Sequence, residues 1–381
     1  MEFDLRSLLG ASSMLSALSA IVMLIMRQSF PASIGGLGYW AGGCLAAVAA
    51  TALLSVRGLI PNFFGIVLAN TMSVAGFMLF YAGLRDFYGL RSQVRPLLAL
   101  LLLAAALIAW FTYVQVNHNM LSLVVPPMFA LLMLASAKTI YQSRQHSAAA
   151  YLTMVTLLST AGVSIARVMT ILTDTDAFTH FLEPTLLQKI YLASFSFFTM
   201  SLTLGLMLMA NERLRTNLEY TAMHDSLTGA YNRGAVLDML SREMARFHRH
   251  GRPLAILMFD LDHFKRINDD YGHLTGDKVI IDFAHRVTHL LRKQDCLGRY
   301  GGEEFVALLP ETTLDEAGIV ATRICTATAL SAQPGLPLYT VSIGVATSVV
   351  GSTSINDLLT QADRCLYRAK KQGRNCVVLM S

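Results

Sequence analysis

The string RYGGEEFV at residues 299–306 places two glycines directly before two carboxylates, Glu303 and Glu304. A double glycine between apolar runs predicts a tight hairpin, because glycine reaches positive φ without a steric penalty from Cβ. Two adjacent carboxylates at the end of such a turn repel each other, so we expect a cation between them. A divalent metal ion bound to a polyphosphate has the required charge and prefers oxygen ligands.

A second pair of carboxylates, Asp260 and Asp262, ends the apolar run at residues 254–262. In a strand these two side chains lie on one face, since they are two residues apart. The first backbone N–H groups of the helix expected next can bind a phosphate, and Lys265 lies in its first turn. An acidic cluster beside a phosphate site predicts nucleotidyl transfer, because two metal ions there stabilise the attacking hydroxyl and the leaving phosphate. Each Asp taken alone is more simply a helix cap, but the spacing and order of the whole set favour catalysis.

Strands and helices alternate through the part of the chain that must position these residues. This pattern predicts an α/β sandwich, with helices flanking a mainly antiparallel sheet. The Gly-Gly hairpin contributes two strands to the sheet. The other expected strands cover 254–262, 339–349 and 375–380, and the expected helices cover 235–250, 264–272, 275–293, 313–331 and 355–371.

Taken in order, the motifs of residues 217–381 resemble the GGDEF diguanylate cyclase family over nearly that whole length. The matching strings are DSLTGAYNR at 225–233, FDLDHFKRIND at 259–269, GHLTGDKVI at 272–280, GGEEF at 301–305, VSIGVA at 341–346 and ADRCLYRAKKQGRN at 362–375. GGEEF is the family signature with Glu in its third position, an accepted variant. The resemblance implies a nucleotidyl-cyclase, palm-like fold and the condensation of two GTP molecules into cyclic di-GMP, with release of two pyrophosphates.

The resemblance also implies a metal site for Mg²⁺ or Mn²⁺. Its ligands would be Asp260, the backbone carbonyl of Leu261, Glu303 and Glu304. Glu303 would in addition activate the 3′-hydroxyl, and Glu304 would support the second metal. Both ions are hard enough for an oxygen-rich site, so the residues do not separate them.

Further residues are matched to the substrate. Asn268 and Asp277 would read the guanine edge, with His273 between them; a carboxylate suits this role because it can accept two N–H donors together. The triphosphate would be held by Lys265, Lys370 and Arg374. Since each domain of the family binds one GTP, catalysis would require two domains facing each other, and we expect a homodimer.

Arg292-Lys293-Gln294-Asp295 has the RxxD pattern, and five residues separate it from Gly301. This position matches the family's product-inhibition site, where cyclic di-GMP would act as an inhibitor. The planar fork of Arg suits a guanine edge together with a phosphate. Arg323 on the following helix would supply a second wall. RxxD is also a common string, and the alternative is a surface ion pair at a helix end.

The composition divides the 381 residues into two halves. Residues 1–210 contain 10 Lys/Arg and 6 Asp/Glu, whereas residues 211–381 contain 20 and 19. The mean hydropathy of the whole chain is +0.49. The apolar excess behind this value lies in the first half, which is membrane-like. No basic stripe with interleaved aromatics is present, so we expect no nucleic acid partner. The five cysteines form no CxxC pair, which favours free thiols in a reducing compartment.

The first half contains seven apolar runs long enough to cross a bilayer. They cover about 8–26, 38–56, 62–84, 97–116, 120–139, 150–172 and 189–210. One set of loops carries Arg27, Arg85, Arg91, Arg95, Lys138 and Arg144, and the other carries Arg57, His118, Asp174, Asp176 and Glu183. The positive-inside rule assigns the first set to the cytoplasm. We therefore expect a multi-pass protein of the bacterial inner membrane, with its N-terminus outside and its catalytic domain inside.

Arg167 lies within the sixth apolar run. An intramembrane Arg needs a partner or a wet cavity, so it is a candidate functional residue. The alternative is that it snorkels to the interface. Pro126-Pro127 interrupts the fifth run, a common feature of membrane helices. The outer loops are short, so any signal from outside would have to be sensed by the helices themselves.

The seventh run continues into an amphipathic segment with Leu214, Leu218 and Thr221 on one face. This segment is either a parallel two-helix stalk or a plain helical linker, and its length does not decide between them. The expected organisation is a transmembrane sensory or anchoring domain at 1–210, a signalling helix at 211–224 and a GGDEF domain at 225–381.

Two other functions compete with a membrane-bound cyclase. A non-catalytic GGDEF domain would act as a nucleotide receptor or signalling partner, and it would be expected to have lost a metal ligand, a guanine reader or a signature acid. A transporter or receptor would do its main work in the seven helices, but no inverted repeat is evident there. No EAL-type motif for hydrolysis of the product is present.

Overall fold

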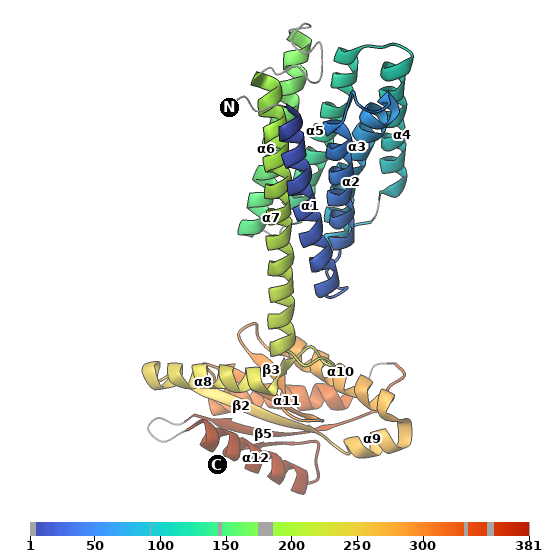
Figure 1. Cartoon of the computed structure of the whole chain (residues 1–381). Coiled ribbons are helices and arrows are strands. Elements are labelled where there is room, and N and C mark those ends of the chain that lie inside the picture. The colour runs from blue at the N-terminus through green and yellow to red at the C-terminus, as the bar shows by residue number, and fades with distance from the viewer. Residues whose placement is uncertain are drawn as a thin grey trace. The chain divides into compact units, whose positions relative to one another are not determined.

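The computed structural model describes residues 5–91, 93–143, 147–173, 186–330, 334–348 and 354–380. The chain divides into two compact units, residues 1–216 and 217–381 (Figure 1). The expected inner-loop residue Arg144 and the acidic loop with Asp174, Asp176 and Glu183 lie outside the described residues.

The first unit is a bundle of helices. Its elements are α1 (Leu5–Ser29), α2 (Leu37–Ser55), the π-helix η1 (Phe63–Leu68), α3 (Ala69–Phe87), α4 (Val94–Tyr113), α5 (His118–Gln142), α6 (Ala148–Thr173) and α7 (Leu186–Met223). Within the described residues, seven helical segments are long and apolar enough to cross a membrane, and η1 and α3 together make the third. The prediction of seven such helices is confirmed.

Small residues bring α2 and α3 close together. A Cβ on Gly43 would lie 3.0 Å from the Gly76 carbonyl oxygen, so no larger side chain fits without a shift. Close backbone approach of this kind is a general means of packing helices in membranes. Deeper in the bundle, the Phe77 ring stacks on Phe198 and lies 4.2 Å from the Phe129 ring, measured between centroids, which joins α3 to α5 and α7.

Helix α7 is a single helix of 38 residues (Figure 1). It includes both the expected seventh span and the expected amphipathic extension, so the prediction that the helix continues past residue 210 is confirmed. Near its end, Leu218 and Tyr220 are exposed. The helix stops at Met223, directly before the first motif of the second unit.

The second unit is a six-stranded mixed sheet flanked by helices. Its elements are β1 (Tyr231–Asn232), α8 (Arg233–His250), β2 (Leu254–Leu261), α9 (Phe264–Tyr271), α10 (His273–Leu290), β3 (Cys296–Arg299), β4 (Glu304–Pro310), α11 (Leu314–Leu330), β5 (Val341–Thr347), α12 (Ile355–Lys371) and β6 (Val377–Leu379). The strand order is β1-β3-β4-β2-β5-β6. The three central pairings are antiparallel, and the edge strands β1 and β6 pair in parallel, which confirms a mainly antiparallel sheet.

The central strand β2 is buried along its whole length, and its two faces pack into different cores. Leu257, Phe259 and Leu261 belong to a core with residues of α9, α10 and α11. The alternate residues Ile256 and Met258 belong to a core with residues of α8 and α12. Because side chains alternate between faces, Asp260 falls on the α12 side of the sheet.

The hairpin between β3 and β4 differs in detail from the expectation. Neither Gly301 nor Gly302 has a left-handed φ, so positive φ is not the reason for the double glycine. The backbone N–H groups of Tyr300 and Gly301 both donate to the Glu304 carbonyl oxygen, at 2.8 and 3.2 Å. A Cβ on Gly301 would lie 2.6 Å from a Glu304 carboxylate oxygen. Room for the acidic side chain therefore accounts for the first glycine, and a Cβ on Gly302 would meet no neighbour.

Candidate active site

Asp260 lies at the end of β2, directly opposite the first residue of β4. Its register partner is Glu304, and this is the last pair of the β2–β4 ladder. One residue further, the Leu261 N–H donates to the Glu303 carbonyl oxygen at 3.4 Å. The N–H and C=O of one strand residue point to the same side, so the Leu261 carbonyl also faces the hairpin. The backbone thus brings Asp260, Leu261, Glu303 and Glu304 to one edge of the sheet, as predicted.

A lysine occupies the position next to these acids. Lys370, on the last turn of α12, forms an ion pair with Asp260, with Nζ 2.6 Å from Oδ2. Burial raises the pKa of the Asp260 carboxyl; Lys370 and, more weakly, Arg374 oppose this shift, and the charge of Asp262 adds to it. Two of the three cations expected to hold a triphosphate therefore act on the acidic cluster directly.

Glu303 is half-buried beside the same charges. Burial and the neighbouring Asp260 carboxylate raise the pKa of Glu303, Lys370 lowers it, and Glu304 contributes a further rise. A carboxylate whose pKa is raised toward neutral pH is a better general base than an ordinary surface glutamate. The rise that the Glu304 carboxylate contributes to the pKa of Glu303 matches the repulsion expected from the sequence.

The chemistry of the donor set suits a hard divalent cation. Carboxylate and carbonyl oxygens are the ligands that Mg²⁺ and Mn²⁺ prefer. Within the described residues, however, no three Asp, Glu, His or Cys side chains converge tightly enough to bind one ion by themselves. A metal held by Asp260 and Glu303 would therefore draw its remaining ligands from the Leu261 carbonyl and from a bound polyphosphate, a usual arrangement for Mg²⁺.

Asp262 does not join this cluster, although its spacing from Asp260 grouped the two carboxylates in the sequence analysis. Its carboxylate, only 4% exposed, accepts hydrogen bonds from the Thr340 and Ser342 hydroxyls, both at 2.7 Å. It also accepts one from the Asn375 backbone N–H at 2.9 Å. Asp262 therefore ties the end of β2 to β5 and to the turn after α12. That turn carries Arg374, which has a left-handed φ of 67°.

The residues expected to read guanine lie on two consecutive helices. Asn268 is on α9, and His273 and Asp277 are in the first turns of α10. Gly272 joins the helices with a φ of 80°, which favours glycine. A Cβ on Gly276 would overlap the side-chain oxygen of Asn268, so Asn268 packs directly against the residue before Asp277. Asn268 thus lies next to the residue that precedes Asp277, and His273 is exposed at the start of α10.

Lys265 lies in the first turn of α9, as expected, and its side chain is exposed. In the part of the chain that the structure describes, it makes no hydrogen bond or ion pair with Asp260 or the hairpin. Of the three predicted triphosphate cations, Lys265 is therefore the one that the fold leaves apart from the acidic cluster.

The RxxD segment folds into a small turn after α10. The Arg292 N–H donates to an Asp295 carboxylate oxygen at 2.9 Å, and the Asp295 N–H donates to the Arg292 carbonyl at 3.0 Å. Burial raises the pKa of Asp295, while the charges of Arg292 and Arg323 oppose the shift. Arg323, on α11, also donates to the Leu290 carbonyl at 2.6 Å. Both arginines thus lie near Asp295, whose second oxygen is buried without a hydrogen-bond partner among the described residues.

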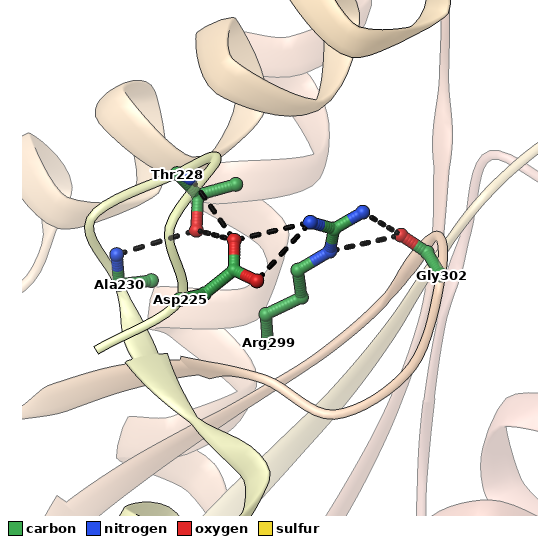
Figure 2. A network of polar contacts seen from close by, with 5 residues as sticks. All are labelled: Asp225, Thr228, Ala230, Arg299 and Gly302. Atoms are coloured by element: carbon green, nitrogen blue, oxygen red, sulfur yellow. Dashed lines mark hydrogen bonds and ion pairs between the residues drawn. The ribbon is translucent and has the colours of Figure 1, made fainter. Parts of the chain in front are cut away.

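One network was not predicted from the sequence. Figure 2 shows Arg299 between Asp225 and the hairpin: its guanidinium contacts both Asp225 oxygens, at 3.0 and 3.2 Å. The same guanidinium donates twice to the Gly302 carbonyl, at 3.1 and 2.9 Å. Burial opposes ionisation of Asp225, but hydrogen bonds from Thr228 and the contact with Arg299 hold the pKa of Asp225 below its usual value. The residue before Glu303 is thus fixed to the turn that follows α7.

Comparison with known proteins identifies the family of the second unit. Residues 222–376 match the family described as "Diguanylate cyclase, GGDEF domain". Diguanylate cyclase DgcP of Pseudomonas aeruginosa is 44% identical over 159 residues, covering 40% of this chain and 23% of DgcP. Diguanylate cyclase DgcM of Escherichia coli K12 is 42% identical over 167 residues, covering 44% of this chain and 40% of DgcM. The chain therefore matches less than half the length of these curated relatives.

Among solved structures, the GGDEF domain of Caulobacter crescentus DgcB in complex with c-di-GMP is 33% identical, with a TM-score of 0.40. The match covers 42% of this chain and 96% of that domain. The family match falls on the second unit, where the acidic cluster and its motifs lie. Residues 222–376 of this chain form a GGDEF domain, the domain of the diguanylate cyclases.

Proposed function

We propose that the chain is a membrane-anchored diguanylate cyclase that condenses two GTP molecules into cyclic di-GMP and releases two pyrophosphates. The observation that carries this proposal is the meeting of Asp260, Glu303 and Lys370 at one edge of the GGDEF sheet. Acids for a metal, a base for a hydroxyl and a cation for a phosphate are the groups that nucleotidyl transfer needs.

In each of two bond-forming steps, a 3′-hydroxyl attacks the α-phosphate of the other GTP, and pyrophosphate leaves. Glu303 accepts the hydroxyl proton, a role that its raised pKa favours. Lys265, Lys370 and Arg374 bind the triphosphate, and Lys370 does so by exchanging its ion pair with Asp260 for a phosphate oxygen. A Mg²⁺ or Mn²⁺ ion held by Asp260, the Leu261 carbonyl, Glu303 and Glu304 would supply positive charge to the phosphates in the transition state.

Asn268 and Asp277 recognise the guanine edge together with His273, which is exposed at the start of α10. The packing of Asn268 against Gly276 supports this assignment, because it holds the amide close to Asp277. An acceptor carboxylate next to an amide complements the N–H donors and the carbonyl of guanine.

A homodimer is part of the proposal, since one domain holds one GTP and the product needs two. The exposed apolar side chain of Leu218 near the end of α7 supports pairing of two such helices. In this organisation residues 1–210 form the membrane domain, residues 211–224 the signalling helix and residues 225–381 the catalytic domain. The membrane domain crosses the bacterial inner membrane with its N-terminus outside.

Cyclic di-GMP is proposed to inhibit the enzyme at Arg292, Asp295 and Arg323. The unpartnered buried oxygen of Asp295 supports a site that guanine N–H donors complete. We expect Arg292→Ala to raise the product concentration needed for half inhibition at least about tenfold, the worth of one charged hydrogen bond. Unchanged inhibition in this variant would leave the RxxD turn with a structural role only.

The test of the main proposal separates binding from turnover. We expect the purified full-length protein to bind GTP and to form cyclic di-GMP with Mg²⁺, and the Glu303→Gln, Glu304→Gln variant to bind GTP but form no product. If the wild type binds GTP and forms no product as a verified dimer, the non-catalytic receptor explains the chain better than the cyclase.

A further inference from the structure

A cavity lies inside the first unit, toward the end of the bundle where α2 gives way to η1 and where α5 and α7 begin. Residues of α1, α2, α3, α5, α6 and α7 line it, so its walls come from most of the bundle. Its volume is about 80 Å³. By the same measure one water molecule needs only about 10–15 Å³, so the cavity has room for a small ligand.

Arg167 of α6 forms part of the cavity wall and is 8% exposed. Its guanidinium donates to the side-chain oxygen of Gln188 at 2.8 Å, and Gln188 is itself buried. The guanidinium carbon also lies 3.9 Å from the centre of the Tyr191 ring. These two contacts from α7 fix the plane of the guanidinium. Arg167 therefore does not snorkel to the interface but is buried and oriented inside the bundle.

A second arginine, Arg57, lines the same cavity from the turn after α2. Small polar side chains accompany the two arginines: Asn70 and Ser73 from α3, and Ser122 from α5. The remaining wall is mostly leucine, valine and phenylalanine. A few oriented polar groups in an otherwise apolar wall are typical of small-molecule sites.

Two helices that border the cavity are irregular beside it. The π-helix η1, Phe63–Leu68, directly precedes the α3 residues of the wall, and π-helical turns often occur at functional sites. In α5, Pro126 has no N–H to donate to the carbonyl of Ser122, four residues earlier, and both residues line the cavity. Neither irregularity is needed to span a membrane.

We propose that this cavity binds a small organic carboxylate with a short apolar body. The planar fork of an arginine matches a carboxylate in bidentate geometry, and an arginine already oriented by its neighbours loses little entropy on binding. The apolar wall suits a hydrocarbon body, and a singly charged head costs less desolvation than a phosphate dianion. This proposal concerns a site in the first unit and does not depend on the cyclase reaction.

The cavity also touches the helix that leads to the GGDEF domain. Tyr191, Leu192 and Phe195 of α7 line it, and α7 continues without interruption to Met223. A ligand that contacts this helix can bias its position or pairing. The effect of the ligand on α7 rests on the proposed function, and it would be measured as a change in cyclase rate. Binding of the ligand is measured separately and does not depend on cyclase activity.

Both tryptophans of the chain, Trp40 and Trp110, belong to the first unit, so their fluorescence reports unfolding of that unit alone. The experiment heats the full-length protein in phosphatidylcholine nanodiscs with acetate, hexanoate, benzoate, succinate or decanoate. Hexanol and benzyl alcohol serve as neutral counterparts. We expect at least one short acid to raise the melting temperature saturably and its alcohol to have no such effect. If decanoate raises the melting temperature more than hexanoate does, the ligand is an acid that reaches the cavity from the lipid rather than from water.

Three variants locate the site. Arg167→Lys keeps the positive charge but removes the planar guanidinium, and we expect it to weaken binding of the acid at least about tenfold. Ser122→Leu keeps both arginines, fills the cavity and should abolish the shift. Arg27→Gln, at an exposed arginine on the last turn of α1, should behave as the wild type. The proposal is overturned if no acid stabilises the wild type, if the alcohols act equally, or if Ser122→Leu responds normally.

Discussion

At the scale of single residues, Asp260 and Asp262 show how two identical side chains take different roles. Asp260 lies within the end of a buried strand and Asp262 directly follows that strand, and both lie toward α12. Asp260 meets a lysine and the hairpin acids, whereas Asp262 is enclosed by two hydroxyls and a backbone N–H. The spacing of the acids in the sequence predicts their shared face, but their partners arrive from residues 340–342 and 370–375, which only the folded chain brings near.

Asp262 is expected to be structural. Replacing it by Ala leaves the buried Ser342 hydroxyl, the half-buried Thr340 hydroxyl and an N–H without their acceptor, so the free energy of unfolding of residues 217–381 should fall by about 2–4 kcal/mol. For a unit of this size the melting temperature should drop by roughly 5–15 °C. Asp270→Ala, which removes only an exposed ion pair with Arg266, is the matched control and should change little. An equal effect of both variants would contradict this role of Asp262.

The raised pKa of Glu303 predicts a pH-dependent cost in stability when no metal is present. The folded state binds this proton more tightly than the unfolded chain. The free energy of unfolding therefore falls as the pH rises from the ordinary pKa near 4.5 through the raised one. Glu303→Gln removes the cost, so it should stabilise the protein in EDTA at pH 7 and have little effect below pH 4.5. The gain should stay under about 1 kcal/mol, because the side chain is partly exposed.

Thermal melts of wild type and variant at pH 4 and pH 7 measure this difference. A lower melting temperature of Glu303→Gln at pH 7 would show that the glutamate stabilises the hairpin, contrary to the repulsion described here. The balance of burial and neighbouring charge that sets this pKa follows from the fold. The sequence identifies the acids and their mutual repulsion, but not that Lys370 would be the cation beside them.

At the scale of secondary-structure elements, the hairpin depends on the turn after α7. Arg299 binds the Gly302 carbonyl with two donors and Asp225 with another (Figure 2). Since Gly302 directly precedes Glu303, a change at Asp225 is transmitted to the proposed base over a few bonded contacts. The arrangement joins the turn after α7 to the hairpin that carries the two acids.

Arg299→Lys should lower kcat about 10- to 100-fold with a small change in KM for GTP, because the hairpin acids lose their fixed position. Asp225→Asn should act through the same contact, so the double variant should be little worse than either single one. Arg252→Ala, which removes an exposed ion pair with Glu311, is the control and should keep wild-type activity. Fully additive effects of the Arg299 and Asp225 variants on kcat would show that the two residues act separately.

Most elements were predictable, and the exceptions have physical reasons. The helix at Ile355–Lys371 and the strand at Leu254–Leu261 match their predicted ranges closely, because their apolar periodicity is strong. Strand β1 was missed: it has two residues and depends on pairing with β3. The role of the double glycine was predicted wrongly, since the four residues between β3 and β4 form a turn in which two N–H groups donate to the Glu304 carbonyl, and this turn needs no left-handed residue.

At the scale of the whole molecule, the division into an apolar and a charge-balanced half agrees with the two compact units. The orientation across a membrane remains a prediction from loop charge. Leu59 and Leu90 lie in loops at opposite ends of α3 and are 70% and 45% exposed. A membrane-impermeant maleimide on intact cells should label Leu59→Cys, and should label Leu90→Cys only after the membrane is opened. The reverse pattern would invert the topology and place the GGDEF domain outside the cytoplasm.

The central claim is that the acidic edge of the GGDEF sheet makes cyclic di-GMP. It is tested most directly by quantifying cyclic di-GMP and pyrophosphate together during turnover of GTP by the full-length protein in nanodiscs. With Mg²⁺ we predict two pyrophosphates for each cyclic di-GMP, and neither product in EDTA or from the Glu303→Gln, Glu304→Gln variant. Cyclic di-GMP from that variant at the wild-type rate, or pyrophosphate without any cyclic dinucleotide, would contradict the assignment of these acids and of the reaction.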